Sequence, residues 1–155
     1  MDKRHLYRVD LEWTGNTGTG TDTYRSYERS YDLSAEGKPV ILGSSDRAFR
    51  GDAGRWNPEE FLVGALVSCH LLSYLHLCSE AGIVVLEYSD HSDGVMEQTA
   101  DGGGRFTRVT LRPVVKIADP AHAEKAKALH HAAHEKCFIA NSVNFPVGCE
   151  ASVVS

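Results

Sequence analysis

One apolar segment in the middle of the chain constrains the fold more than any other feature. Asn57 is a good helix N-cap and Pro58 suits the first helical position. Glu60 stands three residues after Asn57, as in a capping box. The apolar run that follows reaches Ala81, and Gly82 is typical of a helix stop. These signals predict one long helix that starts after Asn57 and ends near Ala81.

The apolar residues of this helix cover most of its circumference, so we expect the helix to be buried nearly all round. A single small domain seldom encloses a helix on every side. Burial in a dimer interface is the natural way to complete it. The apolar residues are Phe61, Leu62, Val63, Ala65, Leu66, Val67, Leu71, Leu72, Leu75 and Leu77.

Short segments on both sides of the helix have strand character, and a second helix is predicted from Pro120 to about Lys136. Gly15, Gly18 and Gly20 predict a turn after the first strand. The pattern indicates an α+β fold with antiparallel strands packed on helices, as one domain over residues 1–155. The predicted strands are His5–Trp13, Thr21–Leu33, Val40–Leu42, Ile83–Tyr88, Val95–Thr99, Phe106–Ile117 and Phe145–Val154.

Charge and hydropathy narrow the function classes. The formal net charge is −5 and Lys and Arg are scattered, which argues against a nucleic-acid surface. No apolar run approaches the roughly 20 residues of a membrane helix, and no signal peptide is evident. We therefore expect a cytoplasmic protein without a membrane partner.

The chain has four cysteines, Cys69, Cys78, Cys137 and Cys149, and no Cys-x-x-Cys pair. Without a secretion signal, reactive, metal-bound or simply buried thiols are better candidates than a disulfide framework. We expect Cys78 and Cys149 to be structural thiols.

Cys69 heads a polar stripe on the predicted helix, because steps of four and three residues also place Ser73, His76 and Glu80 there. The stripe allows a reactive thiol in a dry pocket, or a buried cysteine that acts as a small hydrophobe. The helix dipole fades within the first turn, so a thiolate at Cys69 needs a nearby Arg or protonated His.

Cys137 falls where the second helix should end, in the segment His134–Val143. A thiol at such a joint can move, which suits a resolving cysteine that must meet a sulfenic acid. A core thiol beside Phe138 and Ile139 is the alternative interpretation.

The segment Asn57–His70 resembles the central-helix motif of the OsmC/Ohr family, the osmotically inducible and organic-hydroperoxide-resistance proteins. It carries Asn-Pro-Glu and then Cys69, ten residues after Glu59. Cys137, in His-Glu-Lys-Cys, fits the second family cysteine. The resemblance covers nearly the whole chain and is nearer to the OsmC-like branch than to Ohr. It implies antiparallel sheets packed on a long buried central helix in an intertwined homodimer, with the sites at the subunit interface.

The resemblance also implies a peroxidase that reduces organic hydroperoxides to alcohols, with Cys69 as peroxidatic and Cys137 as resolving cysteine. A dithiol, of which lipoylated proteins are the known type, would recycle the disulfide. No metal, flavin or other cofactor is implied. Glu59 matches the carboxylate of the family motif. Ten residues of helix span about 15 Å, so Glu59 would reach a Cys69 only from the other subunit.

One family feature is missing from this chain. Ohr enzymes carry an activating Arg in the first hairpin, whereas the hairpin here, residues 15–20, has none. The sequence leaves open which arginine replaces it; the candidates are Arg25, Arg29, Arg47, Arg50 and Arg55.

Other functions remain open at this point. The chain fits a non-catalytic OsmC-fold dimer that binds an apolar ligand, or an acyl-transfer site with Cys69 as nucleophile and His76 as base. A peroxidase pocket is expected to be lined by Leu66, Leu72 and Phe61. His130 and His134 lie four apart on a helix, but no third ligand follows from the spacing, so we predict no metal site.

Overall fold

The computed structural model describes residues 2–155. The chain divides into two compact units, Met1–Phe61 and Leu62–Ser155. The expectation of one domain over residues 1–155 stays a prediction.

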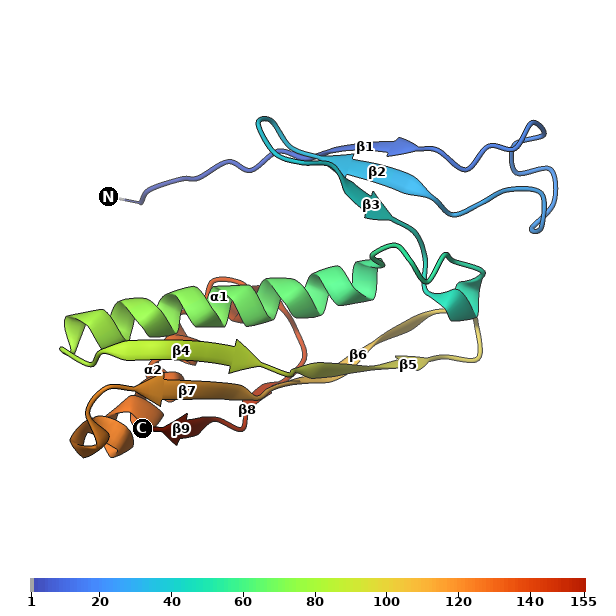
Figure 1. Cartoon of the computed structure of the whole chain (residues 1–155). Helices are drawn as coiled ribbons and strands as arrows, with labels where there is room; N and C mark the ends of the chain where they lie inside the picture. The colour runs from blue at the N-terminus through green and yellow to red at the C-terminus, as the bar shows by residue number, and fades with distance from the viewer. Residues whose placement is uncertain (1) are drawn as a thin grey trace. The chain divides into compact units, whose positions relative to one another are not determined.

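The first unit contains a three-stranded antiparallel sheet in the order β1-β2-β3. Its strands are short (Figure 1): β1 is Asp10–Trp13, β2 is Tyr31–Ser34 and β3 is Ile41–Gly43. A single turn of 3₁₀ helix, η1, follows at Arg47–Phe49.

The strands predicted at His5–Trp13 and Thr21–Leu33 are much longer than those observed. Side chains in the second segment bond to nearby backbone and hold it in turns instead. The Ser26 hydroxyl, for example, donates to the carbonyls of Gly20 and Thr23, at 3.0 and 2.9 Å. Small hydroxyl side chains compete with strand ladders in this way.

The predicted long helix is confirmed as α1, Pro58–Glu80. Asn57 and Glu60 form the expected capping box: the Glu60 N–H donates to Asn57 Oδ1 at 2.8 Å. The Asn57 N–H in turn donates to Glu60 Oε2 at 3.3 Å. Gly82 follows the helix with a φ of 70°, a conformation that glycine adopts without strain.

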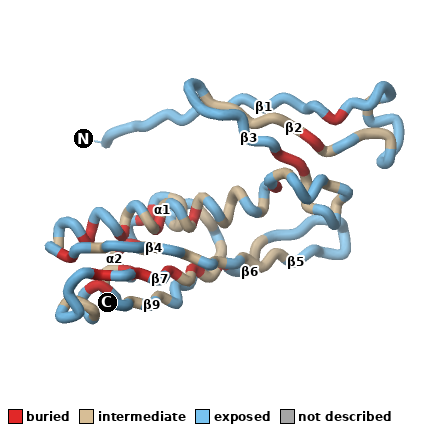
Figure 2. Tube along the Cα trace, in the orientation of Figure 1, coloured by how far each residue is buried: buried red, intermediate tan, exposed pale blue. Residues whose placement is uncertain are grey.

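The expectation that α1 is buried nearly all round is wrong for a single chain. Only one stripe of the helix is buried (Figure 2), and Leu72 on another face is 67% exposed. Apolar side chains such as Leu72 and Leu75 are exposed on α1, so the apolar pattern predicts more burial than one chain provides. The buried residues are Leu66, His70, Tyr74, Leu77 and Cys78.

The expectation that no segment is long and apolar enough to cross a membrane is also wrong. By length and composition alone, α1 passes that test, with 23 residues and a mean hydropathy of 1.7. The core helix of a soluble protein passes it equally. The buried stripe of α1 packs on strands and on a second helix, and 28% of its most apolar window is buried.

The second unit contains most of α1, two three-stranded sheets and a second helix (Figure 1). The sheet orders are β4-β7-β9 and β5-β6-β8. The strands are β4 Val85–Asp90, β5 Asp93–Gln98, β6 Gly104–Leu111, β7 Pro113–Ile117, β8 Val147–Cys149 and β9 Ser152–Val154. The second predicted helix is observed as η2 Pro120–His122 and α2 Ala123–Lys136, and η3 Ala140–Ser142 follows.

The strand predicted at Phe106–Ile117 is two strands, which belong to different sheets and meet at Arg112. The Arg112 N–H donates to Asp90 Oδ1 at 2.9 Å, and its guanidinium pairs with Asp93 and Glu150. These partners are distant in sequence, which explains why a local pattern misses the break.

The closing strand predicted at Phe145–Val154 is likewise split, into β8 and β9. Both run parallel to their neighbours, β8 to β6 and β9 to β7. The prediction of purely antiparallel strands is therefore wrong for the last two strands, while the α+β class holds.

Two apolar clusters form the core of the second unit. The larger joins α1, β7 and α2, with Tyr74 at its centre. The Tyr74 hydroxyl donates to the Ala126 carbonyl of α2 at 2.8 Å, which ties the two helices together. The smaller cluster packs Leu66 of α1 on Val109 and Leu111 of β6.

Leu66→Ala tests the anchoring of α1. Leu66 is fully buried, so its truncation should lower the free energy of unfolding by about 2–5 kcal/mol. Urea unfolding followed by circular dichroism measures the change. Val84→Ala is the matched control, because Val84 is 58% exposed and its truncation should cost no more than about 0.5 kcal/mol. Equal losses in the two variants would contradict the packing described for α1.

Candidate functional site

The structure brings together the two cysteines that the sequence singles out. Cys69 lies in α1 and Cys137 is the C-cap of α2, 68 positions later. Cys69 lies near enough to Cys137 to act on its thiol: burial first, and then Cys69, raise the pKa of Cys137. The structure joins none of the four cysteines in a disulfide.

Cys137 has hydrogen-bond partners within the turn that follows α2. Its side chain is buried, and the Ala140 N–H donates to Cys137 Sγ at 3.4 Å. The Asn141 side chain donates to the Cys137 carbonyl at 3.0 Å and so braces the turn after the helix. Burial is the main cause that raises the pKa of Cys137, with Cys69 second. The buried partner of the pair is therefore a protonated thiol at neutral pH.

A cavity of about 430 Å³ lies between α1 and the end of α2, and neither Cys69 nor Cys137 lines it. Its lining differs from the predicted one, because Leu66 is in the core and Leu72 is exposed. Phe61 belongs to the first unit, where it stacks on Trp56. The lining residues are Ser73, His76, Leu77, Glu135, Lys136, Phe138 and Asn141.

The polar stripe predicted on α1 is not buried. His76 and Glu80 are more than 60% exposed and pair with each other at 3.5 Å. Cys69 is only partly buried. The C-terminal part of the stripe is therefore solvated, while Cys69 and Ser73 are partly buried.

Glu59 lies in the first unit, at the start of α1. Its Oε2 is buried and has no hydrogen-bond partner. Burial and the charge of Glu59 together raise the pKa of Tyr31. A buried carboxylate oxygen without a partner is costly, and the role of Glu59 stays a prediction.

The five candidate arginines all belong to the first unit. Arg29 stacks on the rings of Tyr24 and Tyr27 and donates to both of their carbonyls. Arg55 pairs with Asp32 at 3.5 Å. Within residues 62–155, the groups that act on the Cys137 thiol include no cation. The choice among Arg25, Arg29, Arg47, Arg50 and Arg55 stays open.

The sequence interpretation missed a buried pair of histidines. His70 Nε2 lies 3.0 Å from His130 Nδ1, and both side chains are nearly inaccessible. The Tyr74 ring stacks on His130 with the centroids 3.9 Å apart. The sequence does contain a signal for the burial of His70, because Leu66, His70 and Tyr74 are four residues apart and share one face of the helix.

Cys149 is not a buried structural thiol as predicted, since the residue is exposed at the end of β8. Partial burial of the thiol, with Asp90 and Glu150, raises its pKa to about 11. Cys78 does fit the structural role, because it is buried in the larger core cluster.

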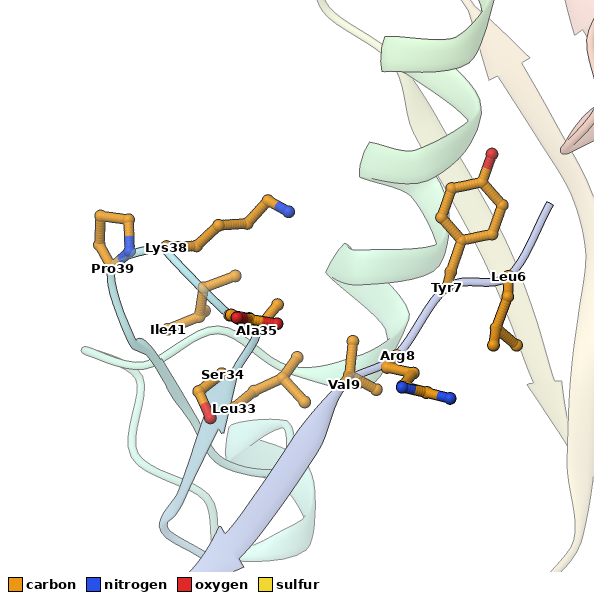
Figure 3. Close-up of a pocket in the computed structure, with 11 residues that line it drawn as sticks. Leu6, Tyr7, Arg8, Val9, Leu33, Ser34, Ala35, Lys38, Pro39 and Ile41 are labelled. Carbon is orange, nitrogen blue, oxygen red and sulfur yellow. The ribbon is translucent and has the colours of Figure 1, made fainter.

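A hollow of about 550 Å³ in the first unit is unrelated to the thiols. It lies between residues 6–9 and the β2–β3 turn (Figure 3), and its lining contains no cysteine or histidine. Leu6, Val9, Leu33 and Ile41 point toward it from both sides. We assign no chemistry to it.

These features define an α+β protein with two neighbouring thiols, one in α1 and one at the end of α2. The sequence profile of the OsmC-like protein family matches residues 51–152. The chain therefore belongs to the OsmC-like family. No curated protein sequence matches it significantly.

Solved structures share the fold. An OsmC-like protein of unknown function from Vibrio cholerae is 28% identical, with a TM-score of 0.85 over 96% of this chain and 99% of that one. An organic hydroperoxide resistance protein from Elizabethkingia anophelis, with thiocyanate bound, is 16% identical, with a TM-score of 0.66 over 99% of both chains. The organic hydroperoxide resistance protein OsmC from Legionella pneumophila is 20% identical, with a TM-score of 0.64 over 98% and 100%.

The histidine pair predicts an acid-sensitive fold. Burial, and then His70, lower the pKa of His130 from 6.5 to about 4, so the folded chain keeps this ring neutral. The pair's contribution to stability is present above about pH 6.5 and is lost as pH falls toward 4, because the unfolded chain binds the proton more readily. The pKa of His70 is also lowered, chiefly by burial; the charge of Asp90 raises it and His134 lowers it.

Urea unfolding at about pH 7.5 and about pH 5 checks this dependence. His130→Gln should flatten it, because glutamine does not titrate. His131→Gln is the matched control on the same helix, since His131 is 81% exposed and should leave the pH dependence intact. The same slope in wild type and His130→Gln would contradict the assignment.

Proposed function

We propose that this chain is a thiol peroxidase that reduces organic hydroperoxides. The observation that carries the proposal is the proximity of Cys69, in α1, to Cys137, at the end of α2, which shows in the effect of Cys69 on the pKa of Cys137. Membership of the OsmC-like family and the likeness to organic hydroperoxide resistance proteins support a peroxide-related role. We also propose a cytoplasmic location, because a cytoplasm keeps thiols reduced between reaction cycles.

The chemistry proceeds in three balanced steps. The Cys69 thiolate attacks the O–O bond of the hydroperoxide, which releases an alcohol and leaves a sulfenic acid on Cys69. Cys137 then attacks this sulfur; a disulfide forms and water leaves. An external dithiol reduces the disulfide to two thiols and is itself oxidised to a disulfide. A lipoylated protein is a dithiol of the required kind.

The environment of Cys137 suits the resolving role. Its raised pKa keeps the thiol protonated, so it does not compete with Cys69 for the peroxide. It also lies at a helix end, where a small movement brings its sulfur onto a sulfenic acid. The neighbouring cavity, with Leu77 and Phe138 in its lining, offers room for the organic part of a hydroperoxide.

Formation of the Cys69 thiolate requires a nearby cation. The candidates for this cation are Arg25, Arg29, Arg47, Arg50 and Arg55. A homodimer would cover the exposed apolar side chains of α1, among them Leu72 and Leu75. It would also give Glu59 of one subunit a way to reach Cys69 of the other, which its position on its own helix does not allow.

One equivalent of cumene hydroperoxide tests the thiol chemistry. After the reaction is stopped and free thiols are alkylated, intact mass and peptide mapping should show a single Cys69–Cys137 disulfide. Cys69→Ser should lower dithiol-dependent turnover by about three orders of magnitude or more, as loss of a nucleophile does. Cys137→Ser should stop at a sulfenic acid that dimedone traps.

Cys78→Ala is the matched control, because Cys78 is a core thiol and its removal should leave the oxidised pair unchanged. If wild-type thiols survive the peroxide, or the disulfide forms elsewhere, the peroxidase proposal is wrong. Unreacted thiols together with tight binding of an apolar ligand would favour a non-catalytic binding protein.

A heterodimer tests whether Glu59 acts across the subunit interface. Mixed and exchanged Glu59→Ala and Cys69→Ser chains should recover about a quarter of wild-type activity, because half of the dimers are mixed and each has one intact site. Glu60→Ala in place of Glu59→Ala is the control for helix capping. No recovery from the Glu59→Ala mixture would show that Glu59 does not act in trans.

A further inference from the structure

A second cluster of reactive groups lies in the second unit, apart from the Cys69–Cys137 pair. It consists of His70 from α1, His130 from α2 and Cys149 from the end of β8. One ring nitrogen of each histidine and the Cys149 sulfur all lie within 4.8 Å of one another. Three elements distant in sequence thus direct two imidazoles and a thiol to one point.

The spacing is close to that of a metal site. Around a tetrahedral Zn²⁺, with Zn–N bonds of about 2.0–2.1 Å, two nitrogens are separated by about 3.3 Å. His70 Nε2 and His130 Nδ1 are 3.0 Å apart, so the two donor atoms already stand at about the separation that the ion requires. The ring planes are within 9° of parallel and the centroids are 5.3 Å apart, so the rings face each other edge to edge and must rotate for both nitrogens to point at one ion.

Unsatisfied polar atoms gather around the same point. Over residues 2–155, five buried side-chain polar atoms have no hydrogen-bond partner, and four of them belong to this region. A neutral histidine pair that shares one proton leaves both outer nitrogens unpaired, which a buried core does not tolerate cheaply. The four atoms are His70 Nδ1, His130 Nε2, Tyr88 OH and Asp90 Oδ2.

A histidine that binds a metal usually donates its other ring N–H to a carboxylate or a carbonyl, and Asp90 is the carboxylate near this cluster. Its charge acts on both His70 and Cys149, so it lies near two of the three converging groups. The Arg112 N–H, at 2.9 Å, and the Ser92 hydroxyl hold Asp90 Oδ1 in place. Asp90 Oδ2 stays buried and unpaired, where an imidazole N–H could donate to it.

A cavity of about 290 Å³ adjoins the cluster and gives it access to solvent. Both His130 and Cys149 line it, so an ion held by them would have an open coordination position. An open fourth position is typical of zinc sites that bind water or an exogenous ligand. The remaining lining residues are Lys127, His131, His134, Val147 and Ala151.

We infer that His70, His130 and Cys149 bind a borderline divalent metal ion of the Zn²⁺ type, with the fourth position open to this cavity. Two imidazoles and a thiolate select zinc and its transition-metal neighbours over Mg²⁺ and Ca²⁺, which require oxygen ligands. The site is separate from the proposed peroxidase and stands whether or not Cys69 reacts with peroxides. Neither histidine spacing nor a short motif reveals it, because its ligands are scattered over β8 and both helices.

Cobalt titration of the reduced, chelator-treated full chain tests the inference. Co²⁺ should bind at one equivalent, with the visible absorption of a tetrahedral ion and a thiolate-to-cobalt charge-transfer band, and Zn²⁺ should abolish both. Cys149→Ser should remove the charge-transfer band. Because Cys149 is exposed, this variant should keep its circular dichroism spectrum.

Asp90→Asn probes the carboxylate behind the ligands and should weaken cobalt binding by about 10–100-fold while the charge-transfer band remains. His76→Gln and Cys69→Ser are matched controls for an exposed histidine and for the other thiol site, and both should bind cobalt like wild type. The inference is overturned if cobalt fails to bind, if it binds without the thiolate band, or if Cys149→Ser leaves the band intact. The cluster is then a hydrogen-bonded histidine pair only.

Discussion

The packing of one face of α1 is the constraint on which the rest of the second unit depends. Leu66, His70 and Tyr74 follow one another at steps of four and are all nearly inaccessible. Successive helical residues point about 100° apart, since a turn has 3.6 residues. Once His70 is fixed in the core, Cys69 is turned to the flank of the helix, where the end of α2 supplies Cys137.

Both sites join the same two helices. His70 lies next to His130, and Cys69 lies near Cys137. Two successive residues of α1 are therefore close to two residues seven positions apart, one in α2 and one at its C-cap. Seven residues are nearly two turns, so His130 and Cys137 lie on one side of α2. The hydrogen bond from Tyr74 to the Ala126 carbonyl adds a third tie. The relative position of the helices is thus determined by the core, and the chemistry of the two sites follows from it.

Local signals in the sequence predicted α1 well, because the capping box of Asn57 and Glu60 and the stop at Gly82 involve only neighbouring residues. The pairing of Cys69 with Cys137 came from the family resemblance, not from spacing. The strand break at Arg112 depends on Asp90 and other distant partners, and no local pattern contains them. The polar stripe was expected on the buried side of α1, but the polar residue that faces the core is His70. An apolar helix with several polar residues does not reveal which of them is buried.

The two clusters require opposite states of their thiols. Cys137 is kept protonated by burial, which suits a thiol that must wait for a sulfenic acid. A metal site needs Cys149 as a thiolate, and the ion itself supplies the charge that stabilises it against its raised pKa. A thiolate bound to an ion has its lone pair engaged and is withdrawn from disulfide exchange. Metal binding would therefore protect Cys149 from oxidation and leave Cys137 as the thiol that meets an oxidised Cys69.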